Sequence, residues 1–309
     1  MQIVLVDASR TVSKIVTQLL QARGYLVLSF ADGPEAISHI KSGAEVDALI
    51  TSVELPSMSG FELCWEVRLL ADRHKPIHII MMSSTYDRGK LAEALDSGAD
   101  DFIGKPPAPE ELYARLRAAE RLVCMQRELI RMATTDPMTT LMNRRALFER
   151  GQQVVAGAAP QAPVSSIIFD IDQFKRINDI FGHDVGDRAI CSVAAAAADE
   201  AAIVGRLGGE EFAILLENRS IEPAFQTAEK LRARVAGLRI PIRDGTLTLT
   251  CSFGVSEWQP GDTLDHLLKR ADVALYQAKR NGRNRVVRYG GDLLDAPAQL
   301  EGSILRSAS

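Results

Sequence analysis

Three short motifs in the second half of the chain combine residue types that could hold a metal ion and phosphate groups. Asp170 and Asp172 end the apolar segment SSIIFDID. Glu210 and Glu211 directly follow a Gly-Gly pair between the apolar segments AIVGRL and EFAILLE. A Gly-Gly pair makes a favourable tight hairpin turn. Two acids immediately after it are unusual for a plain turn, but they suit a cation that prefers oxygen ligands.

The third motif, YQAKRNGRNRV, is basic. Lys279 and Arg283 stand four residues apart near the end of a helical stretch, where both side chains can reach phosphate groups. Each motif alone has an ordinary explanation, because solvated charges are common at the ends of strands and helices. Their combination in this order predicts a phosphate site that depends on a metal ion.

The second half also supplies the elements that would position these motifs. Apolar strands are expected at SSIIFDID, AIVGRL, EFAILLE and LTLTCSFGVSE, and helices at GDRAICSVAAAAADE, EPAFQTAEKLRARVAG and LDHLLKRADVALYQAKRNG. Asp136-Pro137 breaks the helical pattern that precedes them. We therefore expect a domain over residues 135–290, followed by a tail at 291–309 that we expect to be mobile.

The first half alternates five short apolar strands with five helical stretches. This pattern predicts an α/β domain over residues 1–121, with a doubly wound, five-stranded parallel sheet. In such sheets the functional groups lie beyond the carboxyl ends of the strands. Those ends carry Asp7, Ser52, Ser83 and Lys105.

A joining helix is expected from Pro109 to about Thr134, because this stretch has no breaker. At about 1.5 Å per residue it would be roughly 39 Å long. Spacings of four and three predict a coiled-coil seam in this helix, with residues 122–134 as the linker. Alternatively, the early turns pack on their own domain and only the later turns meet a second subunit. The seam positions are Leu112, Leu116, Ala119, Val123, Gln126, Ile130 and Ala133.

The composition limits the classes of protein. The 309 residues carry a formal charge of −4, which argues against a broad nucleic-acid-binding face. No apolar run approaches the ~18 residues of a membrane span, and the chain opens on an apolar strand without a signal peptide. The four cysteines are far apart and are expected to be buried and reduced. We therefore expect a cytoplasmic protein with no membrane and no nucleic-acid partner.

The first half resembles a response-regulator receiver domain in the pieces VLVDAS, TSVELPSMSGFEL, IIMMSS and DDFIGKP. In that family an aspartate four residues before the loop proline accepts a phosphoryl group, and two acids help to hold Mg²⁺. Here Asp7, Ser83 and Lys105 match the family, but Ser52 replaces the acceptor and Ala8 replaces the second acid. The resemblance therefore implies a degenerate receiver pocket in which Asp7 pairs with Lys105.

The second half resembles a GGDEF domain, the catalytic domain of diguanylate cyclases, in its GGEEF form. The resemblance implies an α+β fold similar to the nucleotide-cyclase palm, with a mostly antiparallel sheet wrapped by helices. It also implies a reaction that joins two GTP molecules into cyclic di-GMP and releases two pyrophosphates. Mg²⁺, or alternatively Mn²⁺, would be the metal.

The family's roles can be placed on this sequence. Asp170, the backbone carbonyl of Ile171 and Glu210 match the metal ligands, and either Glu210 or Glu211 would accept the proton. Lys175 matches a residue that stabilises charge on the phosphates. The remaining substrate-binding set is Phe174, Asn178, His183, Asp187, Lys279 and Arg283, in which Asn178 and Asp187 match the guanine readers.

Two departures from the family pattern stand out. In the opening motif DPMTTLMNRR, Met138 and Thr140 replace the usual Leu and Gly. The family's inhibitory R-x-x-D motif is replaced by DEAA at residues 199–202. Tight product inhibition at the usual site is therefore not expected.

The leading hypothesis is thus a homodimeric diguanylate cyclase, assembled through the receiver and the joining helix, with a regulatory protein as a further partner of the receiver. The alternative is a catalytically silent scaffold or cyclic di-GMP receptor. Loss of a metal carboxylate or of the Gly-Gly turn would favour that alternative, and neither is lost in this sequence.

Overall fold

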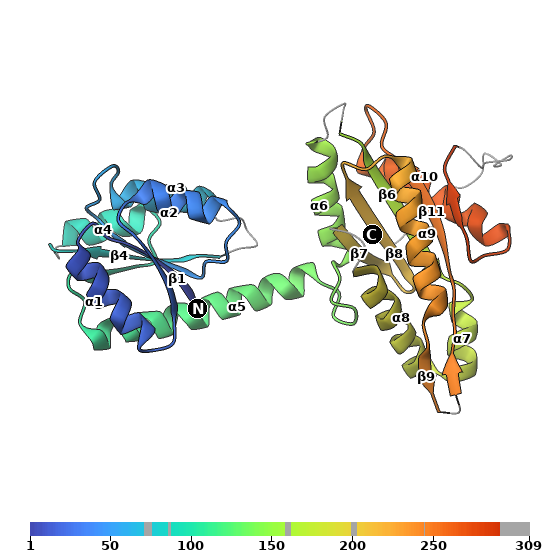
Figure 1. The fold of residues 1–309 in the computed structure, drawn as a ribbon, viewed down its shortest axis with the longest axis horizontal. Coiled ribbons are helices and arrows are strands. Elements are labelled where there is room, and N and C mark those ends of the chain that lie inside the picture. Colours follow the sequence, from blue (N-terminus) through green and yellow to red (C-terminus); the bar gives the residue numbers. More distant parts are fainter. Residues whose placement is uncertain (71–75, 86–87, 158–161, 199–202, 244, 291–309) are drawn as a thin grey trace. The chain divides into compact units, whose positions relative to one another are not determined.

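The structure, a computed structural model, describes residues 1–70, 76–85, 88–157, 162–198, 203–243 and 245–290. It divides into two compact units, Met1–Arg131 and Met132–Ser309, each with its own sheet (Figure 1). The expected tail at 291–309 and the DEAA window at 199–202 lie outside the described residues.

The sheet of the first unit is entirely parallel and has the strand order β2-β1-β3-β4-β5. The order reverses beside β1, so the carboxyl ends of β1 and β3 form the edge where such sheets bind ligands. Asp7 follows β1 and Ser52 ends β3 at that edge. The strands are β1 (Gln2–Val6), β2 (Leu26–Phe30), β3 (Ala48–Ser52), β4 (His78–Ser83) and β5 (Asp101–Gly104).

Helices cover both faces of this sheet. Val16 of α1 and Leu112 of α5 pack into one apolar cluster, and Ala36 of α2 and Leu63 of α3 pack into the cluster on the other face. The α1 helix has a side-chain N-cap, because the Ser9 side chain accepts a hydrogen bond from the Val12 N–H group. The helices are α1 (Arg10–Gln21), α2 (Gly33–Lys41), α3 (Gly60–Leu70), α4 (Arg88–Asp96) and α5 (Pro109–Thr134).

The α5 helix is unbroken over the predicted range, and its early turns pack on their own unit, as the alternative interpretation of the seam expects. The first four seam positions are buried against the first unit, because the apolar side of the helix completes that unit's core. A different stripe of α5 stays exposed, and its spacings of three, four and three are those of a heptad seam. This exposed stripe consists of Leu122, Met125, Leu129 and Met132, which are 49–63% exposed.

The second unit is built on a mixed sheet of order β12-β11-β6-β8-β7, antiparallel except for the β11–β12 pair. A small β10-β9 sheet stands apart from it. The elements are α6 (Arg144–Ala156), β6 (Val164–Ile171), α7 (Phe174–Phe181), α8 (His183–Ala198), β7 (Ile203–Gly208), β8 (Glu211–Glu217), α9 (Ile221–Gly237), β9 (Ile240–Ile242), β10 (Gly245–Leu247), β11 (Cys251–Glu257), α10 (Leu264–Arg280) and β12 (Val286–Arg288).

Two apolar layers flank the central sheet. One cluster joins the sheet to α7, α8 and α9, and the other joins it to α6 and α10 (Figure 1). The prediction of one strand at LTLTCSFGVSE is wrong, since β10 ends at Leu247 and β11 begins at Cys251. Residues 248–250 lie between these two strands, and the Thr250 carbonyl accepts a hydrogen bond from the Asp172 N–H group at 2.9 Å.

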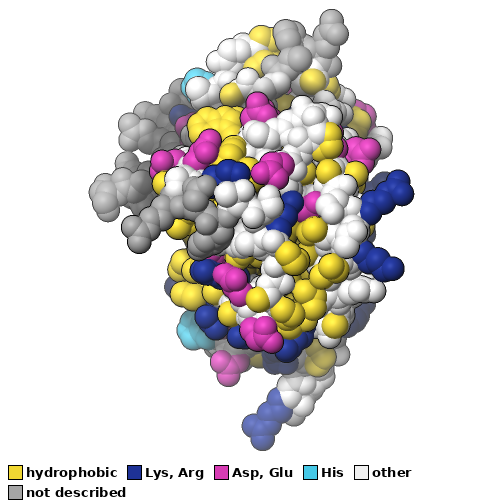
Figure 2. Space-filling view, turned by 90° about the vertical axis from the view of Figure 1, so that its left-hand side faces the viewer, with side chains coloured by type: hydrophobic (Ala, Val, Ile, Leu, Met, Phe, Trp, Pro, Cys, Tyr) yellow, Lys and Arg dark blue, Asp and Glu magenta, His cyan; other side chains and the backbone are white. Residues whose placement is uncertain are grey.

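One face of the molecule carries side chains of both charge signs (Figure 2). On the face shown in Figure 2, basic and acidic side chains are interspersed, with hydrophobic groups between them, so this face does not present one charge sign. None of the helices in the described part of the chain has the length and apolar character needed to cross a bilayer. The expectation of buried cysteines holds for Cys64 and Cys251 but is wrong for Cys124 and Cys191, which are exposed.

Candidate active site

A cluster of carboxylates lies where β6 and β8 end side by side. Asp170 of β6 stands opposite Glu211 of β8 in the strand register and is only 5% exposed. The Nζ atom of Lys279, from α10, lies 2.9 Å from the Asp170 Oδ2 atom. The Ile171 N–H group donates to the Glu210 carbonyl at 3.4 Å. The structure thus brings together five predicted site residues from three separate segments.

Burial makes this cluster electrostatically costly. Burial raises the pKa of Asp170 to about 6; Lys279 opposes this rise, while Glu210 and Glu211 add to it. The pKa of Glu211 is likewise raised by burial, again against the effect of Lys279. Asp272, one helical repeat before Lys279 on α10, also has a pKa raised by burial. Lys279, with Arg144 as a weaker influence on Glu211, does not offset the burial of these carboxylates, which is the condition that a bound cation would relieve.

Asp272 was not among the site residues predicted from the sequence. The signal was available, because Asp272 and Lys279 are seven residues apart and so lie on one face of the α10 helix.

The Gly-Gly turn is held from outside by an arginine. Gly208 and Gly209 have φ values of 152° and 53°, which favour glycine. The Arg206 guanidinium donates two hydrogen bonds to the Gly209 carbonyl, at 2.9 and 2.7 Å, and two to the Asp136 carboxylate, at 3.1 and 3.3 Å. Although burial opposes the shift, hydrogen bonds from Thr139 and Arg206 hold the pKa of Asp136 below its usual value. The opening motif therefore braces the turn that carries the glutamates.

The Thr140 departure has a structural cost. Thr140 adopts a φ of 61°, in the left-handed region where a β-branched residue is strained. We expect Thr140→Gly to raise the free energy of unfolding by up to about 1 kcal/mol, because glycine removes the strain but loses more chain entropy on folding. Denaturant unfolding at equilibrium measures this change.

The matched control is Thr140→Ala, which also removes the hydroxyl but keeps a Cβ atom at the same φ. Alanine should give no gain in stability. An equal gain for alanine and glycine would show that the hydroxyl, and not the backbone, carries the strain.

The predicted guanine readers meet where α7 packs against α8. Asn178 of α7 has a buried Oδ1 atom without a hydrogen-bond partner. A Cβ atom on Gly186 would come within 1.9 Å of that oxygen and within 3.2 Å of Phe174, so a larger residue here would displace the Asn178 side chain. Asp187 follows on the exposed side of α8, and His183 begins that helix. The unpartnered amide oxygen is a group that a bound base would satisfy.

The remaining predicted site residues are exposed. Lys175 lies on α7, and Arg283 lies in the turn after α10 with a φ of 62°. No described hydrogen bond or ion pair joins either side chain to Asp170. They remain predicted phosphate-binding residues.

The carboxylate cluster fits a hard divalent cation. Its donors are carboxylate and carbonyl oxygens, and the lysine ammonium on Asp170 shows that a cation is accommodated there. Within the described ranges, no three His, Cys, Asp or Glu side chains are arranged to hold a metal alone. Oxygens from a bound phosphate would therefore have to complete the coordination.

The receiver pocket of the first unit contains the predicted ion pair. The Lys105 Nζ atom lies 2.6 Å from Asp7 Oδ2 and 2.5 Å from the Ser52 hydroxyl oxygen. Ser52 is fully buried and donates to the Glu54 carbonyl at 2.7 Å. Ser83 is buried at the end of the neighbouring strand. Lys105 thus forms an ion pair with Asp7, the carboxylate that remains at the family's acidic positions.

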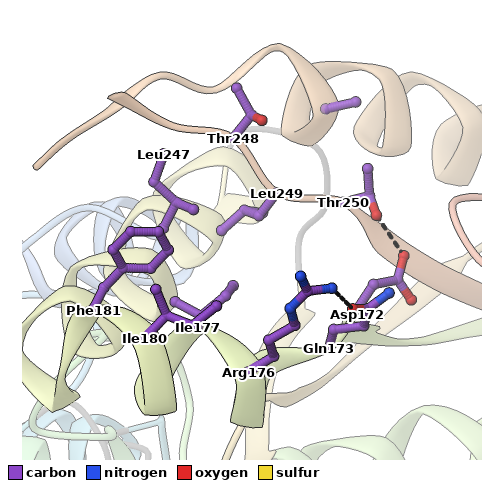
Figure 3. Close-up of a pocket in the computed structure, with 11 residues that line it drawn as sticks. Asp172, Gln173, Arg176, Ile177, Ile180, Phe181, Leu247, Thr248, Leu249 and Thr250 are labelled. Carbon is purple, nitrogen blue, oxygen red and sulfur yellow. Dashed lines mark hydrogen bonds between the residues drawn. The ribbon is translucent and has the colours of Figure 1, made fainter. Parts of the chain in front are cut away.

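A cavity of about 420 Å³ lies beside α7 (Figure 3). It is lined by α7 side chains between Gln173 and Phe181 and by residues 247–250, with Asp172 at its polar end. Phe174 and Asn178 do not line it. This cavity is therefore separate from the expected guanine site.

Fold and site together define a class of protein: a receiver-type α/β unit followed by a nucleotide-cyclase-type unit with carboxylates at a Gly-Gly turn. The family model "Response regulator receiver domain" matches residues 3–117, and "Diguanylate cyclase, GGDEF domain" matches residues 133–285. The chain therefore belongs to the GGDEF family, in the form that carries a receiver domain.

The chain is similar to curated proteins over most of its length. It is 34% identical over 262 residues to the response regulator PleD of Caulobacter vibrioides, covering 80% of this chain and 58% of PleD. It is 30% identical over 269 residues to the diguanylate cyclase DgcM of Escherichia coli, covering 80% of this chain and 63% of DgcM. The chain thus spans less than two thirds of the length of either relative.

A solved structure supports the fold of the second unit. The coiled coil and GGDEF domain of DgcB from Caulobacter crescentus, in complex with c-di-GMP, matches with a TM-score of 0.53 and 34% identity. The match covers 57% of this chain and 98% of that chain.

Proposed function

We propose that the protein is a diguanylate cyclase that joins two GTP molecules into cyclic di-GMP and releases two pyrophosphates. The observation that carries the proposal is the carboxylate cluster of Asp170, Glu210 and Glu211 around Lys279. A buried excess of negative charge beside a lysine costs stability. Such an excess of negative charge is favourable in a site that binds a divalent cation together with a nucleotide.

In this proposal each residue has a separate task. Asp170, Glu210 and the Ile171 carbonyl hold Mg²⁺ or Mn²⁺, which when bound polarises phosphate oxygens and makes the 3′-hydroxyl more acidic. Glu211 accepts the 3′-hydroxyl proton, because burial has raised its pKa toward the range that suits a base at neutral pH. Lys279 then leaves Asp170 and binds phosphate oxygens.

Lys175 and Arg283 add positive charge to the phosphates, where negative charge develops during the transfer. The base is held by the α7–α8 pair. Asp187 accepts hydrogen bonds from the N1–H group and the exocyclic amine of guanine, and adenine does not offer both donors. Asn178 supplies the free amide oxygen beside it.

We expect Gly186→Ala to raise the KM for GTP at least about fivefold. The added Cβ atom would displace the Asn178 side chain and so misplace a guanine contact, whose loss costs about 1–3 kcal/mol. Steady-state kinetics in GTP give the KM. The control is Ser192→Ala on the same helix, whose hydroxyl bonds only its own helix at the Arg188 carbonyl. An unchanged KM for Gly186→Ala would contradict the placement of the guanine site.

Turnover requires two such domains, since each holds one GTP and each 3′-hydroxyl must attack the other nucleotide. We propose a homodimer formed through the receiver and α5. The exposed stripe of α5 supports it, because four large apolar side chains at heptad spacing are left uncovered by the chain's own core. A dimer raises the local concentration of the second domain to millimolar order.

We also propose that the receiver does not work by phosphoryl transfer. Its acceptor position is a buried serine whose hydroxyl is already engaged by Lys105 and Glu54, with no base beside it among the described residues. A partner protein on the receiver, or the amount of protein made, would then set the fraction of dimer.

Ser52→Ala should leave the specific activity within about twofold of wild type, with or without acetyl phosphate. Its effect should appear in stability, because losing a buried hydrogen bond costs about 1–2 kcal/mol. Activity assays and thermal unfolding separate the two effects. A phosphodonor response that vanished in Ser52→Ala would refute the degenerate receiver.

The proposed function itself is tested by incubating purified protein with GTP and Mg²⁺ and identifying products by mass spectrometry, with ATP as the control substrate. Cyclic di-GMP and pyrophosphate from GTP alone support it. Nucleotide binding without any product would favour a silent scaffold.

A further inference from the structure

The carboxylate of Asp172 has no task in the chemistry proposed above, although it lies two residues beyond Asp170 and is only 8% exposed. Its oxygens accept three hydrogen bonds. Oδ1 accepts from the Ser252 hydroxyl at 2.6 Å, and Oδ2 accepts from the Thr250 hydroxyl at 2.7 Å and the Asn284 N–H group at 3.0 Å. An ionised carboxylate only accepts hydrogen bonds, so it suits three converging donors.

Two of these donors belong to the segment that enters β11. The Asp172 N–H group also donates to the Thr250 carbonyl at 2.9 Å, and Figure 3 shows the Thr250 side chain pointing toward Asp172. Ser252 is fully buried and lies opposite Asp170 in the β6–β11 register. Asp172 therefore ties this segment to the strand that carries the metal ligand.

The third donor belongs to a strained turn. Gly282, Arg283 and Asn284 have φ values of 109°, 62° and 44°, so three successive residues are left-handed. This conformation costs an L residue roughly 1–2 kcal/mol, and it persists only where surrounding groups hold it. The Ala278 carbonyl accepts from the Arg283 N–H group at 3.0 Å, and Arg232 donates to the Asn284 side chain at 3.0 Å.

We propose that Asp172 is a positioning residue for the triphosphate, which holds the left-handed turn through the Asn284 N–H group and so directs Arg283 at the terminal phosphates. The inference rests on the proposed function, which assigns Arg283 to those phosphates. Arg283 and Asn284 are exposed, whereas Ser252 is fully buried. Weakening the acceptor at Asp172 should therefore disturb the turn before it disturbs the sheet.

The test is a double-mutant cycle with Asp172→Asn and Arg283→Ala. Calorimetry measures the affinity for a GTP analogue with a methylene bridge between the α and β phosphorus atoms, and for GMP, which lacks the terminal phosphates. Asp172→Asn should weaken binding of the analogue five- to tenfold and binding of GMP less than twofold. In the Arg283→Ala background it should change neither affinity by more than twofold, because the two residues act as one unit.

The matched control is Asp262→Asn, which alters another largely buried carboxylate of this unit. Asp262 holds a loop through the Gln259 N–H group at 2.7 Å and an ion pair with Arg270. Asp262→Asn should lower the stability of the protein, but it should not change the affinity for the analogue relative to the affinity for GMP.

Additive effects of Asp172→Asn and Arg283→Ala, or an equal loss of affinity for GMP and the analogue, would overturn the positioning role. If wild type binds GMP but gains nothing from the terminal phosphates, the assignment of Arg283 fails and the inference fails with it. If wild type binds neither nucleotide, the proposed function itself fails. Should Asp172→Asn not fold, Thr250→Val removes one donor and leaves the carboxylate. Thr250→Val should lower the affinity for the analogue two- to threefold. In the Arg283→Ala background it should not change that affinity.

Discussion

Asp170→Asn is expected to abolish cyclic di-GMP synthesis and, in the same variant, to raise the melting temperature of the metal-free protein at neutral pH. Turnover is lost because an amide is a poor ligand for a hard cation. Stability rises because the wild-type carboxylate is buried beside Glu210 and Glu211, and Lys279 does not fully offset that cost.

The effect of Asp170 on the free energy of unfolding depends on pH. A folded-state pKa raised to about 6 means that the folded protein binds a proton more tightly than the unfolded chain. The contribution of Asp170 to stability is thus fully present below about pH 4 and is lost as the pH rises through about 6. The gain from Asp170→Asn should be near zero at pH 4 and reach about 1–3 kcal/mol above pH 6.

Thermal unfolding in a chelating buffer across pH 4–8 measures this gain. Asp262→Asn provides the opposite control, because the hydrogen bond from Arg270 holds the pKa of Asp262 below its usual value. That substitution should destabilise the protein at neutral pH. An Asp170→Asn variant that retains turnover, or that melts earlier at pH 7 than wild type, would show that Asp170 belongs to a structural ion pair and not to a metal site.

The second large effect is expected from charges on the exposed stripe of α5. Met125→Glu with Leu129→Glu should reduce specific activity at least tenfold at nanomolar protein and less at high concentration, because the charges oppose burial of the stripe between two copies. Both side chains are 63% exposed, so the fold of the single chain should not suffer. Analytical ultracentrifugation and activity across a range of protein concentrations measure the effect.

The control separates the observed stripe from the seam expected at first. Gln126 is exposed and lies on the side of α5 where that seam would continue. Gln126→Glu should leave both assembly and activity unchanged. Variants with charges at Met125 and Leu129 that remain dimeric and fully active would rule out this surface as the interface.

The contrast between the two seams shows why sequence alone mistook the helix face. Heptad spacing describes both sets of residues on α5 equally well. The spacing places Leu112 and Leu116 in the seam, and the sequence left open whether they face a partner or their own unit; they complete the core of their own unit. Only the presence of the sheet beside the helix decides which apolar side remains uncovered, and this is tertiary information.

Other features were predictable because their causes are local. The parallel five-stranded sheet follows from the alternation of apolar strands with helices, and the Gly-Gly turn follows from the backbone freedom of glycine. The α7 helix was missed because it has only eight residues, and residues 248–250 were read as strand from their β-branched composition. In both places Asp172 or its neighbours make contacts from residues far along the chain, which no local pattern contains.

The continuity of α5 sets a rule for its length. Each residue of a helix adds 1.5 Å and turns the chain by about 100°, so one inserted residue would rotate everything after it relative to the exposed stripe. Seven residues restore nearly the original phase, leaving about 20° of difference. If the stripe pairs two chains, homologous proteins should differ in the length of this helix by whole heptads. The spacing between their receiver and cyclase units would then be quantised.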